Sequence, residues 1–358
     1  MINNQLAVNL FAFFSGFILV LLLTPLIAKL AKKFNIIDRP GTAARKIHDQ
    51  PIPLLGGLAI FLAFFLGLAI FRFGQLANFS RVPDSYLLII FVASLLIMLG
   101  GFLDDKYGLK PSRQIIWPLL AALLVVSAGV KISFITNPLG GADNLILYLS
   151  PILGSVLAFF WLMGMMYTTK FLDGLDGLAV GIGAIASIMI FLVSLKWDVP
   201  LSITGVGGLI LFGSTLGFLI FNFQPAKIFL GEGGSIFLGF ILGVLSILSG
   251  SKISTTLLVV GLPAVDVLWV TIQRLLLHQS PFSHADRKHL HFQLLTAGFS
   301  RREAVLLLYL IALSFGAIGL MVGSFGKLIS LMLLLAVMVM IVLSIAWRKK
   351  KYGGQFLD

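Results

Sequence analysis

Two adjacent carboxylates mark the first place where this sequence could do chemistry. Asp104 and Asp105 follow an apolar run, in the segment Gly-Phe-Leu-Asp-Asp-Lys-Tyr-Gly-Leu. Like charges this close repel each other, and a divalent cation or a metal-bound phosphate would relieve the repulsion. A helix end solvated by water would also tolerate the pair. The motif alone leaves both interpretations open.

A second pair of carboxylates is spaced three residues apart. Asp173 and Asp176 stand in Lys-Phe-Leu-Asp-Gly-Leu-Asp-Gly-Leu-Ala, so both lie on one face if the segment is helical. Gly174 and Gly177 leave room for a ligand to approach the backbone. The segment leads into an apolar run, where an uncompensated charge is costly. Ligand binding and helix capping both remain explanations.

A lone carboxylate, Glu232, is surrounded by glycines in the segment from Asn222 to Ser235. Backbone N–H groups of such a loop could bind phosphate, with Lys227 as a point charge and Phe229 as a stacking face for a base. A glycine-rich turn between spans is the alternative. Carboxylate oxygens from several such loops would favour magnesium or manganese over zinc.

Two histidines follow a basic run late in the chain. His289 and His291 are two residues apart and come just after Asp286 and Arg287. The pattern indicates an anion site, whereas zinc would need a further ligand such as His284. A pair of interfacial histidines without a ligand is the alternative.

One more acid, Asp266, lies within an apolar run about two helical turns before Arg274. An acid at this depth either supports the site or pairs with a basic residue of another helix.

The elements that must position these residues are membrane-spanning helices. Hydrophobic residues make up 59% of the 358 residues, charged residues only 11%, and the mean hydropathy is +1.05, which excludes a water-soluble globular protein. About eleven apolar stretches are long enough to span a bilayer. They run over 6–28, 54–71, 86–103, 115–130, 146–167, 178–195, 201–222, 235–250, 254–273, 304–322 and 328–347. The sequence therefore predicts an all-α polytopic integral membrane protein with one membrane domain over 1–358.

Absent residues and motifs narrow the chemistry further. The chain has no cysteine, which excludes disulfides, thiolate metal sites and cysteine nucleophiles. It has no nucleophile elbow, Walker loop or dinucleotide fingerprint, which weakens hydrolase, ATPase and dehydrogenase interpretations.

The basic residues set the expected orientation. With the N-terminus outside and the C-terminus inside, 20 of the 26 Lys and Arg residues fall on the inner side. The net charge of +12 is then a sign of topology rather than of nucleic-acid binding. The run Arg348 to Lys351 is expected against anionic lipid headgroups. Because the acidic and histidine motifs share the inner face, we expect the active site to face the cytoplasm.

Together these motifs resemble the polyprenyl-phosphate N-acetylhexosamine-1-phosphate transferase family, glycosyltransferase family 4. The resemblance covers nearly the whole chain and keeps the order of the motifs. It rests on Asp38-Arg-Pro, Arg45-Lys-Ile-His, Pro51 to Gly57, Asp104-Asp105, Leu172 to Ala179, Asn222 to Ser235 and Asp286 to His291.

The resemblance implies a magnesium-dependent enzyme of the inner (plasma) membrane, with Mn²⁺ as a substitute metal. Such an enzyme transfers a HexNAc-1-phosphate, here GlcNAc-1-phosphate, from a UDP-sugar to undecaprenyl or another polyprenyl phosphate. It releases UMP and starts cell-envelope polysaccharide synthesis. The resemblance is also compatible with a homodimer. Whether the transfer is one direct displacement or passes through a covalent intermediate stays open.

The resemblance also implies roles for individual residues. The catalytic pair would be Asp104 and Asp105, and the metal-binding residues would be Asp176 and Glu232. The expected nucleotide contacts are Asp173, Phe229, Lys170 and Asn222. The expected contacts to pyrophosphate or lipid phosphate are Lys46, His289, His291 and Arg287.

Several positions depart from the family pattern. Lys170 and Tyr167 stand where two asparagines are usual, and Glu232 replaces an aspartate, which lengthens that side chain by one methylene. The other departures are Gln114, Pro118 and Phe292, where Lys, Gln and His are expected.

Alternatives to a GlcNAc-1-phosphate transferase remain. The phospho-MurNAc-pentapeptide branch is the first alternative. It typically carries three consecutive histidines, which the His-Leu-His-Phe segment lacks, so the sequence favours the GlcNAc-1-phosphate branch. An ion-coupled transporter is the second, although it predicts acids near the bilayer midplane and inverted repeats.

Overall fold

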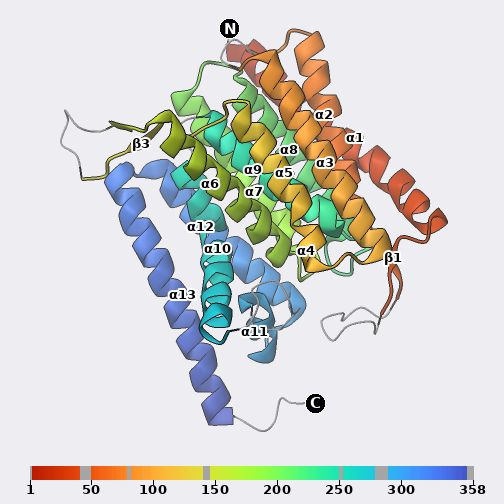
Figure 1. The fold of residues 1–358 in the computed structure, drawn as a ribbon, viewed down its shortest axis with the longest axis vertical. Coiled ribbons are helices and arrows are strands. Elements are labelled where there is room, and N and C mark those ends of the chain that lie inside the picture. Colours follow the sequence, from red (N-terminus) through yellow and green to blue (C-terminus); the bar gives the residue numbers. More distant parts are fainter. Residues whose placement is uncertain are drawn as a thin grey trace.

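The structure of the chain is a computed structural model that describes residues 2–40, 50–78, 82–139, 146–249, 253–278 and 289–352. These residues are mostly helical, with two short hairpins (Figure 1). The helices are α1 (Ile2–Lys33), α2 (Gly56–Phe73), α3 (Asp84–Tyr107), α4 (Pro111–Gln114), α5 (Ile116–Ser127), α6 (Pro151–Leu172), α7 (Leu178–Trp197), α8 (Ile203–Asn222), α9 (Gly231–Leu248), α10 (Ile253–Leu276), α11 (Leu290–Thr296), α12 (Arg301–Met321) and α13 (Ser324–Tyr352). The strands are β1 (Ile37–Asp38), β2 (Ile52–Pro53), β3 (Phe134–Thr136) and β4 (Ile146–Tyr148), paired antiparallel as β1–β2 and β3–β4.

Ten helices in the described part of the chain are long and apolar enough to cross a membrane, which confirms the all-α polytopic prediction. The eleventh expected stretch, 115–130, is the short helix α5. The apolar run continues further, but α5 ends at Ser127 and Gly129 then takes a left-handed φ of 103°. Hydropathy alone does not register this turn.

The centre of the bundle is formed by α7, α8 and α9, which are the most buried spans, while α1 and α13 lie at the periphery. Helix α8 packs on α1 and α7, and α9 packs on α3 and α6. The peripheral helices expose large apolar side chains such as Leu22 and Leu343, as a surface in contact with lipid does. Figure 1 shows the start of α1 and the end of α13 at opposite ends of the molecule.

Local signals explain where several helices start and stop. The side chain of Ser150 accepts from the backbone N–H of Leu153 at the start of α6, and Ser300 with Glu303 forms a capping box at the start of α12. Helix α3 ends where Gly108 adopts a φ of 63° and donates its N–H to the carbonyl of Asp104. That stop places the adjacent acids Asp104 and Asp105 in the last turn of α3.

Glycines allow the start of α9 to lie directly against α2 and α3. A Cβ built on Gly101 would lie 2.1 Å from the Cα of Gly233, and one on Gly57 would lie 2.0 Å from the Cα of Gly234. Small residues let helix backbones approach closely in a membrane. This packing carries Glu232, at the start of α9, to the end of α3.

Candidate active site

The acids at the ends of three helices converge at one end of the bundle, where α3 and α6 end and α9 begins. The backbone N–H of Glu232 donates to Oδ1 of Asp105 at 3.1 Å. The carboxylates of Asp104, Asp173 and Glu232 are close enough to Asp105 to repel it electrostatically. The structure therefore brings four of the predicted acids together, from α3, the end of α6 and α9.

The side chain of Asp104 is held through one of its two oxygens. Its Oδ1 accepts from the backbone N–H of Leu109 at 2.7 Å and from Nε2 of Gln114 at 2.9 Å. The same Nε2 also donates to the carbonyl of Leu109 at 2.9 Å. These contacts fix the rotamer of Asp104, and they leave Oδ2 without a hydrogen bond from the described residues.

A lysine lies among these acids. Lys170, in the last turn of α6, forms an ion pair with Glu232 and donates to Oε1 of Gln114 at 3.0 Å. Its Nζ also lies 5.6 Å from the centre of the Tyr167 ring. Because Oε1 of Gln114 is engaged by Lys170, the Nε2 of the same amide is directed to Asp104. One continuous polar chain therefore joins α9, α6, α4 and α3.

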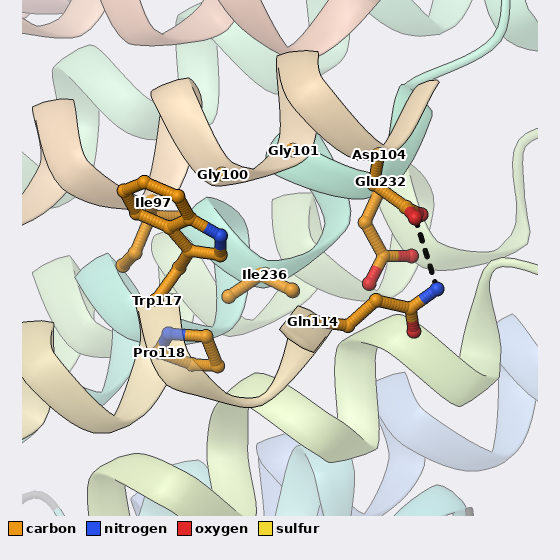
Figure 2. Close-up of a pocket in the computed structure, with 9 residues that line it drawn as sticks. All are labelled: Ile97, Gly100, Gly101, Asp104, Gln114, Trp117, Pro118, Glu232 and Ile236. Atoms are coloured by element: carbon orange, nitrogen blue, oxygen red, sulfur yellow. Dashed lines mark hydrogen bonds between the residues drawn. The ribbon is translucent and has the colours of Figure 1, made fainter. Parts of the chain in front are cut away.

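A crevice adjoins this polar chain and runs between α3, α5 and α9 (Figure 2). Figure 2 shows Asp104, Gln114 and Glu232 at one end of it and apolar side chains at the other. It is lined by Ile97, Gly100, Gly101, Asp104, Gln114, Trp117, Pro118, Glu232 and Ile236. The site thus has a charged side and an apolar side next to each other.

Two predicted site residues hold the loop between α8 and α9 to the start of α7. Oδ2 of Asp176 accepts from the backbone N–H of Ala226 at 3.0 Å. Asn222 is buried; its Oδ1 accepts from the N–H of Gly177 at 3.1 Å and its Nδ2 donates to the carbonyl of Ile228 at 2.9 Å. Both ends of the Asn222 amide are therefore used by the backbone, so its evident role is to position this loop.

Phe229, in the same loop, is held by its backbone. Its N–H donates to the carbonyl of Pro53 in β2, and its carbonyl accepts from the N–H of Gly56, each at 2.9 Å. The ring is half-buried and does not belong to the fully enclosed core.

The histidines pack on α10 and on the end of α6. His289 Nδ1 lies 2.9 Å from Oδ2 of Asp266, and Oδ1 of Asp266 accepts from the backbone N–H of Leu290 at 3.0 Å. The rings of Phe171, His289 and His291 form one stack, with successive centroids 5.3 Å and 5.9 Å apart. Of the two alternatives for Asp266, the structure supports the first: it holds the histidine loop.

His291 faces the Asp-Gly motif. A Cβ on Gly174 would lie only 2.3 Å from Nε2 of His291. The side chain is buried, and Nε2 has no hydrogen-bond partner in the part of the chain that the structure describes. Burial, and secondarily the neighbouring His289, lower the pKa of His291 to about 3, so its ring is neutral at physiological pH.

The residues present fit a divalent cation in charge and in donor type. Asp104, Asp173 and Glu232 crowd Asp105 with like charge, and a divalent cation would relieve this repulsion. Carboxylate oxygens suit Mg²⁺ or Mn²⁺. In the described residues, however, no group of three or more acids and histidines is arranged as a closed metal cage. An ion here would also need oxygens from water or from a bound phosphate.

The remaining predicted residues, Lys46 and Arg287, lie outside the described residues, as do His284 and Asp286. Conversely, Tyr309 of α12 was not singled out from the sequence, and its hydroxyl donates to the carbonyl of Gly177. A single tyrosine in an apolar span carries no sequence signal of this role. Gln114 was noted only as a departure, and its two-sided hydrogen bonding depends on helices far apart in the sequence.

Comparison with known proteins relates this chain to transferases that act on polyprenyl phosphates. The profile described as glycosyl transferase family 4 matches residues 87–250. The chain is 33% identical over 322 residues to the probable undecaprenyl-phosphate N-acetylglucosaminyl 1-phosphate transferase of Bacillus subtilis, covering 88% of this chain and 85% of that protein. It is 34% identical over 306 residues to the decaprenyl-phosphate N-acetylglucosaminephosphotransferase of Mycolicibacterium smegmatis, covering 78% and 74%. It is 27% identical over 299 residues to the undecaprenyl-phosphate alpha-N-acetylglucosaminyl 1-phosphate transferase of Thermotoga maritima, covering 83% and 86%.

Proposed function

Because this chain belongs to glycosyl transferase family 4, we propose that it transfers N-acetylglucosamine 1-phosphate from UDP-GlcNAc to undecaprenyl phosphate or a related polyprenyl phosphate. An oxygen of the lipid phosphate forms a bond to the sugar-linked phosphorus. The bond from that phosphorus to the UMP oxygen breaks, and UMP leaves with the electron pair. The products are a polyprenyl diphosphate sugar and UMP.

The observation that carries this proposal is that acids and apolar side chains line one crevice. Asp104 and Glu232 line the same crevice as Ile97 and Trp117. A lipid phosphate needs apolar surface for its chain and, within a few ångströms, a polar site for its head. The nucleotide sugar needs the polar side only. The arrangement supports a reaction between one lipid-borne and one water-borne anion.

Asp104 is the group that we assign to activate the lipid phosphate. Its Oδ1 is anchored by Leu109 and Gln114, so Oδ2 can accept a proton from, or orient, the attacking phosphate. Asp105 lies next to Asp104 in the same acidic site, and its Oδ1 accepts from the backbone N–H of Glu232 at the start of α9. Fixed geometry of this kind is the main contribution that a protein makes to phosphoryl transfer.

We assign Mg²⁺, with Mn²⁺ as a substitute, to the carboxylates of Asp176 and Glu232. Glu232 belongs to the acid cluster around Asp105, whereas Asp176 is described at the loop between α8 and α9. When bound, such an ion neutralises the charge of the diphosphate. The chain's own residues then orient the substrates. His289, held by Asp266, and the neutral His291 contact phosphate oxygens, together with Lys46 and Arg287. Asp173 and Phe229 contact the nucleotide, and Asn222 supports that contact by holding the loop.

We assign the site to the cytoplasmic face of the inner (plasma) membrane, with the N-terminus outside. The support is the distribution of basic residues, 20 of 26 of which fall on that side in this orientation. UDP-sugars are water-soluble nucleotides, which fits a site open to the cytosol. The homodimer implied by the family resemblance remains a prediction.

The test is release of UMP by purified protein given UDP-GlcNAc, undecaprenyl phosphate and Mg²⁺. We expect turnover that stops when either substrate or Mg²⁺ is left out, and that falls to background in Asp104→Asn. UDP-MurNAc-pentapeptide, run in parallel, should give no more than background. Preference for the pentapeptide substrate would move the chain to the lipid I branch, and no release with either sugar would refute the enzyme assignment.

A further inference from the structure

Lys170 forms an ion pair that the proposed reaction does not by itself require. Its ammonium group is paired with Glu232, and both side chains are about 17% exposed. A second contact to Gln114 and the nearby ring of Tyr167 keep it in place. The ammonium group is therefore held at a carboxylate that we assign to the metal.

Further carboxylates lie around this pair. Asp104, Asp173 and Glu232 each lie within electrostatic range of Asp105, and Lys170 forms its ion pair with Glu232. Lys106, the next residue after the acid pair, is exposed and lies over the rings of Phe102 and Tyr107 instead. Like charges crowded around Asp105 repel one another, and a divalent cation would relieve that repulsion.

A divalent cation and the ammonium group would compete for the same oxygen. The ion pair uses Oε1 of Glu232. A lysine is a point charge on a flexible stem, so it can leave a carboxylate without movement of the backbone. A divalent ion carries twice its charge and attracts the surrounding carboxylates more strongly at equal distance.

We propose that Lys170 is a built-in counter-ion of Glu232 that a divalent cation displaces when it binds. The inference rests on the metal site of the proposed function. In the metal-free protein Lys170 neutralises Glu232 and, through Gln114, keeps Asp104 oriented. Binding of the ion releases the amine of Lys170, and the affinity for the ion is lowered by the cost of this release.

The test is direct binding of Mn²⁺ to the purified full-length protein, followed by electron paramagnetic resonance of the free ion. We expect Lys170→Gln to bind Mn²⁺ at least about fivefold more tightly than the unchanged protein, because the competing charge is gone. Lys170→Arg keeps the charge and should bind no more tightly than the unchanged protein. Lys106→Gln, which removes an equal charge nearby without breaking the ion pair, should change the affinity less than about twofold.

Equal or weaker Mn²⁺ binding by Lys170→Gln would overturn the competition while leaving the metal site intact. Absence of Mn²⁺ binding in every protein tested would instead refute the metal site of the proposed function.

A second measurement needs no variant and so does not depend on the folding of Lys170→Gln. Lysines of the unchanged protein are acylated with and without Mg²⁺, and the modified residues are quantified by mass spectrometry. Labelling of Lys170 should rise severalfold with Mg²⁺, while labelling of Lys106 stays constant. If Mg²⁺ leaves the labelling of Lys170 unchanged or lowers it, the displacement does not occur.

Discussion

At the scale of single residues, the orientation of Asp104 depends on the amide of Gln114. Replacing Gln114 by Ala removes the donor to Oδ1 of Asp104 and the acceptor of Lys170 together. Because a misplaced reactive group costs on the order of 100-fold, we expect kcat to fall by about that factor with little change in KM. Steady-state kinetics with both substrates measure this. Ser112→Ala, on the exposed face of the same short helix, is the matched control and should keep normal kcat; a normal kcat in Gln114→Ala would contradict the role.

The carboxylate of Asp266 fixes the ring of His289. One oxygen of Asp266 forms a buried hydrogen bond with Nδ1 of His289, and the other accepts from the N–H of Leu290. Nε2 of His289 is therefore the ring nitrogen available to a ligand. Asp266→Asn removes the charge that holds the imidazole, and we expect kcat/KM to fall roughly tenfold to a hundredfold. Asp266→Glu should restore part of it. Unfolding temperatures in detergent separate this effect from loss of fold, and unaltered kcat/KM in a folded Asp266→Asn protein would refute it.

The buried, neutral His291 makes the fold sensitive to acid. Its pKa is lowered from 6.5 to about 3, so the unfolded chain takes up a proton at a pH where the folded chain does not. The contribution of His291 to the free energy of unfolding is therefore complete above pH 6.5 and is lost progressively as the pH falls toward 3. We expect His291→Gln to lose less stability than the unchanged protein between pH 7 and pH 5. Thermal unfolding across this pH range measures it, and equal losses in both proteins would argue against the buried neutral ring.

At the scale of elements, the contact of α9 with α3 brings Glu232 to Asp105. Because the Cα of Gly233 lies 2.1 Å from a Cβ built on Gly101, Gly101→Val must push the two helices apart. Overpacking of this kind costs about 1–3 kcal/mol or more, and the separated acids should lose most activity. Gly164→Ala, where a Cβ meets nothing within 4 Å, is the control and should leave unfolding temperature and kcat unchanged. Normal activity in Gly101→Val would show that the close packing is dispensable.

The helices also show which structural features the sequence predicts and which it does not. Spans such as α3 and α9 follow from apolar runs of bilayer length, and the acids at their ends follow from motif position. The helix α5 was wrongly expected to extend to residue 130, because a left-handed turn at Gly129 leaves no mark in hydropathy. The chain of contacts from Glu232 through Lys170 and Gln114 was not foreseen either. It joins residues from four helices, and no local pattern reports such tertiary distances.

At the scale of the whole molecule, the account requires opposite ends of the bundle to face opposite sides of the membrane. The chain has no cysteine, so single cysteines can be introduced cleanly. Ser112 lies in α4, before α5, and Leu139 follows β3, after α5; both are exposed. In right-side-out vesicles an impermeant maleimide should label Leu139→Cys at once, and Ser112→Cys only after permeabilisation. The reverse pattern would place the site outside.

The central claim is that this membrane bundle joins a sugar phosphate to a lipid phosphate, and the lipid product tests it most directly. Purified protein is incubated with undecaprenyl phosphate, UDP-GlcNAc and Mg²⁺, and the lipid fraction is analysed by mass spectrometry. We predict a new lipid whose mass equals undecaprenyl phosphate plus the GlcNAc-1-phosphate unit, formed in equal amount with UMP and missing in Asp104→Asn. Consumption of UDP-GlcNAc without that lipid, or no product at all from active-site-intact, folded protein, would contradict the account.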